Sequence, residues 1–241
     1  MTPPKDAIRR RREREARELD ILQAAQELMA EEGYLGLTMD QVAKAVGYSK
    51  PTVYEHFRTK EDLVMAVCTY SFQVRADMFE AAARRQAPPR ALIHALGVAD
   101  RVYWLDHPIH ESTASLVMTP SILEKTSEER RNGFLDVKRR AFEHTVAIVR
   151  AGIAAQDLDA DHDPREVTLA LWSLSIGVQS FARGGHMLPA VGITEPAQAL
   201  RRAQLRYLDG IGWAPLTEAW DYDSFEAGVE RELHELFDAP A

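Results

Sequence analysis

Residues 38–63 constrain the fold of this chain more than any other segment. Thr38 and the glutamine three residues later have the spacing of a capping box, which satisfies the first backbone N–H groups of a helix. Gly47 supplies the left-handed conformation that ends a helix tightly. Ser49 can cap a second helix, whose first turn tolerates Pro51. The segment therefore predicts two short helices joined by a glycine turn.

The apolar pattern predicts which way these helices face. Val53 and Phe57 are four residues apart, so they lie on one face of the second helix and are expected to point inward. Thr59, followed by two acidic residues, predicts the capped start of a third helix. Two short helices that present one helix end on a compact support have the geometry needed to enter a DNA major groove.

The stretch from Ile21 to Leu63 resembles the DNA-binding region of the TetR (tetracycline-repressor-type) family of transcriptional regulators. The residues that carry the resemblance are Ala24, Ala25, Gly33, Tyr34, Thr38, Val42, Ala43, Gly47, Ser49, Val53, Tyr54, Phe57, Lys60, Glu61 and Leu63. The family pattern Tyr-x-x-Phe-x-x-Lys-x-x-Leu is present, and His56 occupies a common position for histidine. Pro51 departs from the family pattern, which frequently has a small residue there.

This resemblance implies roles for residues that the core does not require. Thr38, Tyr54 and Lys60 are expected to hold phosphates, and a packing role is the alternative for Tyr54. Lys50 and Thr52, with Ser49 and His56, are expected to face base edges or the adjacent backbone. The full set of candidate DNA-binding residues is Thr38, Ser49, Lys50, Pro51, Thr52, Tyr54, His56 and Lys60.

The balance of basic and acidic residues differs between the first 60 residues and the rest of the chain. The formal net charge is -8, which disfavours a diffuse nucleic-acid binder, but the first 60 residues carry eleven Lys or Arg against ten Asp or Glu. The run Arg9–Arg12 is the densest basic stretch. Such an arm can reach along phosphates or into a minor groove; the alternative is a solvated, frayed extension. No apolar region follows it, which disfavours a presequence.

The length leaves room for a small DNA-binding domain and a larger partner domain. The helical periodicity predicts the all-α class, and the resemblance implies what the larger domain does. The expected parts are a basic extension (1–16), a three-helix DNA-binding domain (17–63) with a connecting helix to about residue 86, and a larger helical domain for effector binding and dimerisation (87–241). Cys68 is the only cysteine, which fits a reducing cytoplasm. No apolar run approaches the roughly 18 residues of a membrane span, so a soluble, cytoplasmic protein without a membrane partner is expected.

Beyond residue 63 the apolar periodicity is helical throughout. A short helix is expected around 111–118, and a final one near 224–237 with Asp223 as its cap. Longer helices are expected at about 60–85, 90–107, 128–155, 164–184 and 195–211.

The apolar pattern of one expected helix indicates that the protein forms an oligomer. The segment from Val167 to Phe181 is apolar on two sides, so one side is expected to meet the protein's own core and the other a second subunit. The candidate interface residues are Val167, Leu171, Leu174, Val178, Leu200, Tyr207 and Leu208. In the TetR family the last two major helices pair with their symmetry mates as a four-helix bundle. A twofold dimer predicts a palindromic operator; a monomer with a thick core is the alternative.

A small-molecule effector is implied by the resemblance alone. The family holds an effector in a largely apolar cavity, and its binding shifts the helix that begins at Lys60 and releases DNA. The candidate pocket residues are Tyr103, Trp104, His107, Phe134, Phe142 and Trp172. Simple core packing is the alternative for each of them.

Two other functions compete with the expected one, which is a repressor that is not an enzyme and has no cofactor or metal. The cluster His107, His110 and Glu111 could serve a metal-dependent hydrolase. Its spacing differs from the His-Glu-x-x-His of helical zinc enzymes, and Pro108 interrupts it. The other alternative is a DNA-binding dimer with no effector. The expected partners are therefore double-stranded DNA, a second copy of the chain and an unidentified small molecule.

Overall fold

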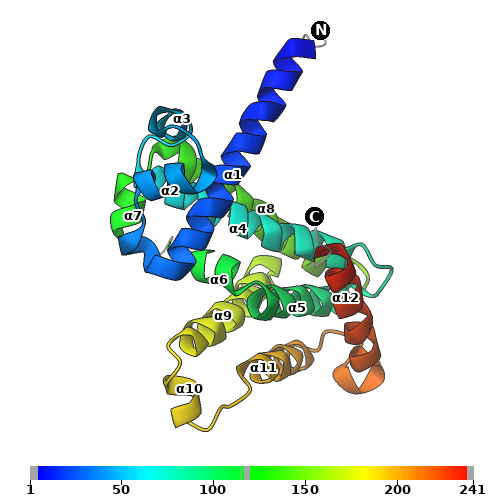
Figure 1. Cartoon of the computed structure of the whole chain (residues 1–241). Coiled ribbons are helices and arrows are strands. Elements are labelled where there is room, and N and C mark those ends of the chain that lie inside the picture. The colour runs from blue at the N-terminus through cyan, green and yellow to red at the C-terminus, as the bar shows by residue number, and fades with distance from the viewer. Residues whose placement is uncertain (1–4, 115, 117–119, 238–241) are drawn as a thin grey trace. The chain divides into compact units, whose positions relative to one another are not determined.

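The computed structural model describes residues 5–114, 116 and 120–237. Within these ranges the chain is helical and contains no β-strand (Figure 1), which confirms the all-α prediction. The helices are α1 (Lys5–Gly36), α2 (Met39–Val46), α3 (Lys50–His56), α4 (Lys60–Ala83), α5 (Pro89–Asp106), α6 (Pro108–Ala114), α7 (Pro120–Lys125), α8 (Glu128–Ala154), α9 (Pro164–Arg183), α10 (Met187–Ala190), α11 (Pro196–Gly210) and α12 (Tyr222–Phe237). No helix of the described ranges is long and apolar enough to cross a membrane.

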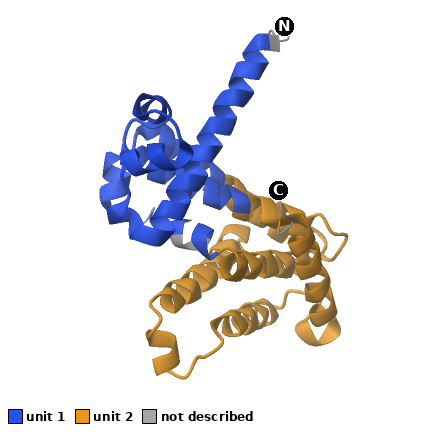
Figure 2. Ribbon diagram, viewed as in Figure 1, with its two compact units in different colours: residues 1–74, 108–137 blue, residues 75–107, 138–241 orange. Residues whose placement is uncertain are grey.

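Two compact units make up the chain (Figure 2). Unit 1 contains residues 1–74 and 108–137, and unit 2 contains residues 75–107 and 138–241. The helix-turn-helix segment therefore shares a core with residues far along the chain. Ile122 of α7 and Phe134 of α8 belong to the same buried cluster as the residues that anchor α3.

Within unit 1, hydrogen bonds connect the start of α4 to the turn between α7 and α8. The Asp62 carboxylate accepts from the backbone N–H of Ser127 at 2.7 Å, and the Thr126 hydroxyl donates to the Glu61 carbonyl at 3.3 Å. Asp62 is buried, and its own backbone N–H donates to the hydroxyl of Thr59 at 3.0 Å. Thr59 thus caps α4 as the sequence predicts.

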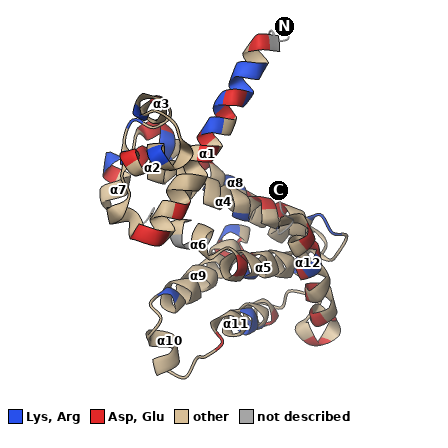
Figure 3. Cartoon of the chain, viewed as in Figure 1, with Lys and Arg blue, Asp and Glu red and all other residues tan. Residues whose placement is uncertain are grey.

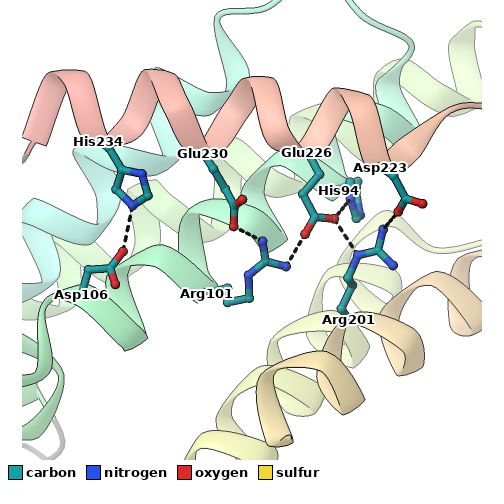
Figure 4. A network of polar contacts seen from close by, with 8 residues as sticks. All are labelled: His94, Arg101, Asp106, Arg201, Asp223, Glu226, Glu230 and His234. Carbon is teal, nitrogen blue, oxygen red and sulfur yellow. Dashed lines mark hydrogen bonds and ion pairs between the residues drawn. The ribbon is translucent and has the colours of Figure 1, made fainter.

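In unit 2, an ion-pair network joins α12 to α5 and α11 (Figure 4). The Glu226 carboxylate accepts from Arg201 Nε at 2.6 Å, lies 3.0 Å from His94 Nε2 and pairs with Arg101. Burial alone would raise the pKa of Glu226, but the hydrogen bonds from His94 and Arg201 and the charge of Arg101 outweigh it and lower the pKa to about 2. Glu226 therefore contributes stability that is present above its ordinary pKa of 4.5 and is lost as the pH falls toward 2.

A buried arginine holds the segment between α11 and α12. The side chain of Arg90 is fully buried, and its Nη1 donates to the carbonyls of Trp213 and Pro215, each at 2.6 Å. Its Nη2 donates to Asp209 Oδ1 at 2.6 Å and to the Thr217 hydroxyl at 3.0 Å. Four hydrogen bonds from one guanidinium thus fix this connection.

Two helix starts differ from the sequence-based expectation. The short helix expected around 111–118 begins already at Pro108, because proline is well tolerated in a first turn; residues 117–119 lie outside the described ranges. The final helix begins at Tyr222. Asp221, rather than Asp223, accepts the Ser224 backbone N–H at 3.0 Å, while Asp223 pairs with Arg201.

Candidate nucleic-acid interface

The helix-turn-helix is shaped by local hydrogen bonds. The Thr38 hydroxyl accepts the Gln41 backbone N–H at 3.2 Å and caps α2. The reciprocal half of the capping box is absent, because the Gln41 side chain instead donates to Glu32 Oε2 at 2.6 Å. Gly47 ends α2 in the left-handed region with φ 69°, and the backbone N–H of Tyr48 returns to the Ala43 carbonyl at 3.1 Å.

α3 has one buried face and one exposed face. Ser49 accepts the backbone N–H of Thr52 at 3.3 Å and caps the helix. Val53 and the capping residue Phe57 have no exposed surface, which confirms the predicted inward anchors. Tyr54 is 47% exposed, and Lys50 and Pro51 are exposed beside it, whereas Thr52 is half-buried. The outward face of α3 is therefore available to a partner.

The lysine on this face has an acidic partner. Lys50 Nζ lies 2.5 Å from Asp40 Oδ2 of α2, and both side chains are more than half exposed. An ion pair this exposed contributes only about 0.2–1 kcal/mol, so a phosphate or a base edge can displace the carboxylate at little cost. Asp40 was not among the residues predicted to matter at this surface.

Replacing Asp40 by asparagine is expected to strengthen DNA binding by up to about fivefold, the equivalent of an exposed ion pair. The measurement is fluorescence anisotropy with a short duplex at fixed salt. Asp161→Asn, on an exposed loop of unit 2, removes the same charge and serves as the control. The gain should vanish when Lys50 is also changed to alanine. An equal gain in that background would show that Asp40 acts by general repulsion.

Lys60 lies in the first turn of α4, against an aromatic ring. Its Nζ is 4.4 Å from the centroid of the Tyr34 ring and 3.5 Å from the Leu35 carbonyl oxygen. Partial burial lowers the pKa of Lys60, and the charge of Glu61 opposes this shift. Thr38, the other residue expected to hold a phosphate, is exposed.

His56 is placed differently from the expectation that it faces DNA. Its side chain is only 5% exposed, and Nδ1 lies 3.7 Å from Glu18 Oε2 of α1. Arg130 of α8 lies beside both residues and donates to the His56 backbone carbonyl at 3.2 Å and to the Glu18 carboxylate at 3.0 Å. Sequence spacing could not reveal this, because Arg130 is more than seventy residues away.

The six candidate pocket residues do not form one group. Phe134 packs in the core of unit 1, perpendicular to Phe72 with ring centroids 5.2 Å apart. Phe142 and Trp172 meet in unit 2 at 5.2 Å. The other three candidates also belong to unit 2. Tyr103 is buried, and Trp104 and His107 are half-buried.

A pocket in unit 2 lies elsewhere, between α5 and α11. Its lining includes His94, Gly97, Arg101, Arg201 and Gln204, and none of the six candidate residues lines it. This pocket adjoins the ion pairs that hold α12, because three of its residues belong to that network.

The candidate dimer residues divide by burial. Val167, Leu171, Leu200 and Leu208 are buried within unit 2, and Leu174, Val178 and Tyr207 are half-buried. The exposed apolar residues of α9 are Leu169, Ile176 and Phe181, at 50 to 59% exposure. The helix thus has the two apolar sides that the sequence predicts. Leu169 and Ile176, seven residues apart, form the outward side, whereas Phe181, five residues beyond Ile176, points in another direction.

The histidines considered for a hydrolase lie in different units. Gln26 Nε2 donates to His110 Nδ1 at 2.7 Å, and the Ser71 hydroxyl lies 3.1 Å from the same nitrogen, within unit 1. His107 belongs to unit 2. The side chain of Glu111 lies outside the described residues. Among those described, no group of three or more His, Cys, Asp or Glu is arranged to hold a metal ion.

Comparisons with known proteins agree with this geometry. Residues 21–67 match the family of bacterial regulatory proteins named tetR. The HTH-type transcriptional activator FasR of Mycolicibacterium smegmatis is 41% identical over 54 residues, a stretch that covers 22% of this chain and only a quarter of FasR. A tetR-family regulatory protein from Rhodococcus RHA1 has a TM-score of 0.62 at 23% identity, covering 82% of this chain and 97% of that one. A regulator from Saccharomonospora viridis, solved in complex with choline, has a TM-score of 0.61 at 21% identity, covering 81% and 96%.

The capped helix pair and its exposed α3 define a DNA-binding protein of the helix-turn-helix class. Residues 21–67 of this chain therefore carry a DNA-binding region of the tetR family of bacterial regulatory proteins.

Proposed function

We propose that the protein is a repressor that binds a palindromic operator as a homodimer and is released by a small molecule. The observation that carries the proposal is the exposed face of α3, where Lys50, Pro51 and Tyr54 stand outward from a helix fixed by Val53 and Phe57. A helix held in this way can enter a major groove without rearranging its support.

The outward side of α9 supports the dimer. Leu169 and Ile176 are seven residues apart, which places them on one stripe of the helix, and both are more than half exposed. Large exposed apolar side chains gathered on one helix face mark an interaction surface. A self-complementary contact of this face would relate the two copies by a twofold axis. That symmetry would set two copies of α3 about 34–36 Å apart on DNA.

The effector is proposed as a small apolar or amphipathic molecule. The choline complex of the Saccharomonospora viridis regulator supports the idea that this fold accommodates small organic ligands. Phe142 and Trp172 of unit 2 supply aromatic surface of the kind that such ligands contact. Release of DNA would follow from tighter binding of the effector to one of two dimer geometries.

Sequence selection from random duplexes with purified protein, at two salt concentrations, tests the proposal. A palindromic site with half-sites about one turn apart, bound less tightly at higher salt, is the expected result. No enriched sequence at low salt would remove the proposed function. The selected site then serves in a search for effectors by loss of binding.

A second function, activation, is favoured by the likeness of residues around the motif to FasR, which is named an activator. In vitro transcription from a promoter that carries the selected site separates the two. A repressor lowers transcript yield, and an activator raises it.

Tyr54→Phe is expected to weaken binding to every duplex by a similar factor of about tenfold, because the hydroxyl is proposed to donate to a phosphate rather than to a base. Anisotropy titrations on the selected site and on a scrambled duplex measure both affinities. Tyr70→Phe, on a half-buried tyrosine of α4, is the control. A loss confined to the selected site would reassign Tyr54 to base recognition.

A further inference from the structure

The first part of α1 is a helix without a packing partner in the described residues. The side chains from Asp6 to Arg17 are exposed, and the buried residues of this helix begin at Ile21. Figure 1 shows this part of α1 running beyond the rest of unit 1. At 1.5 Å per residue, the exposed part is about 18 Å long. Helices of this length are marginal in water by themselves, and burial of apolar surface does not account for this one.

Ion pairs within the extension neutralise some of its arginines. Arg9 Nε lies 3.7 Å from Glu13, and Arg11 Nε lies 2.7 Å from Glu15, each pair one helical turn apart. These pairs support the helix. The arginines outside these pairs are the source of the extension's positive charge. Figure 3 shows the Lys and Arg residues of this part of α1 as blue bands between red acidic ones.

Three of the remaining arginines form one stripe. Arg10, Arg14 and Arg17 are spaced by four and three residues, so they share a face of α1. Ile21, four residues further on, continues the same line and is fully buried. These three arginines, called the basic stripe below, therefore extend the face of α1 that packs on the helix-turn-helix. Among the described residues, no ion-pair partner faces any of the three.

The basic stripe begins beside the end of α3 that is expected to meet DNA. Tyr48 directly precedes Ser49, the cap of α3, and its hydroxyl donates to Asp20 Oδ2 of α1 at 2.5 Å. Arg17 precedes Asp20 by three residues, within one turn of α1, so it lies near this hydrogen bond. Arg14 and Arg10 lie about 4.5 and 10.5 Å farther along the helix.

We propose that the basic stripe binds the phosphate backbone of the same duplex that α3 enters, beside the groove. This proposal rests on the proposed function, since it adds a second contact to the same partner. A span of about 10.5 Å matches about three phosphates of one strand, which are 3.4 Å apart along the helix axis. The extension thus acts as a rigid helical arm rather than a frayed tail, and it contributes affinity without reading sequence.

A pair of matched double variants tests the proposal in the full chain. R10Q/R14Q removes two charges from the basic stripe, and R9Q/R11Q removes the two charges of the same helix that are paired with glutamates. Glutamine keeps the helix propensity, and circular dichroism checks that helix content is unchanged. The measurement is the slope of log K against log salt on the operator obtained by selection. R10Q/R14Q is expected to make the slope shallower by about 1.8, two contacts at about 0.9 each, with sequence preference unchanged.

The control variant R9Q/R11Q is expected to keep the parent slope. Equal slopes for the parent and R10Q/R14Q would overturn the proposal, and so would equal losses in both double variants. Failure of the proposed function looks different, because the parent protein itself would then select no sequence. A duplex trimmed to the two half-sites gives an independent check. The parent protein should bind this trimmed duplex less tightly than the longer operator, whereas R10Q/R14Q should bind both with the same affinity.

Discussion

Ile176→Glu is expected to yield a monomer and to lower operator affinity by about 10²- to 10⁴-fold. The side chain is 53% exposed at the middle of the outward apolar side of α9, so the substitution does not disturb the core of unit 2. In the proposed dimer, however, two glutamates would face each other near the twofold axis and be buried without a partner. Losing the dimer removes the second α3 from the operator, and with it the avidity of two linked contacts.

Sedimentation velocity at micromolar concentration measures the oligomeric state, and anisotropy measures binding. Leu236→Glu is the matched control, because Leu236 is a similarly exposed leucine on α12. It should leave both quantities unchanged. A dimer that survives Ile176→Glu would place the interface elsewhere on the chain.

Arg90→Leu is expected to destabilise the protein by about 3–5 kcal/mol. The substitution leaves the Asp209 carboxylate without its buried cation and removes the donor to the Trp213 carbonyl, while the Pro215 carbonyl keeps only the Tyr222 hydroxyl. In a protein of this size each kcal/mol shifts the melting temperature by about 2–4 °C, so a fall of roughly 10 °C is expected. Tryptophan fluorescence reports the transition, because one of the four tryptophans, Trp213, is fully buried next to Arg90.

Arg84→Leu is the control for this prediction, because Arg84 is exposed and lies just beyond α4. It should change the melting temperature by no more than a degree or two. A similarly small effect of Arg90→Leu would mean that water replaces the guanidinium and satisfies the same oxygen atoms.

The parts of the fold that sequence could predict are those decided by neighbouring residues. Thr38, Gly47 and Ser49 each act within three or four positions of their own place in the chain, so the helix-turn-helix follows from local chemistry. The inward direction of Val53 and Phe57 is equally local, because α3 has only one apolar face.

The parts that sequence could not predict depend on distant partners. The ring of His56 lies beside Glu18, and the His56 carbonyl accepts from Arg130; these two partners come from opposite ends of unit 1. In α9, periodicity gives two apolar sides but not which of them faces inward, and the packing against α11 decides that. This is why Val167 and Leu171 are buried while Ile176 is exposed.

The discontinuity of unit 1 has a consequence for how the protein is made. Ile122 and Phe134 complete the buried cluster that supports α3, and residues 108–137 are translated only after α5. A nascent chain that ends near residue 74 therefore carries the whole motif but leaves part of its support unformed. Because domains fold as units during synthesis, the helix-turn-helix is expected to mature only when more than half of the chain has emerged. The polypeptide would thus acquire affinity for the chromosome late in its synthesis.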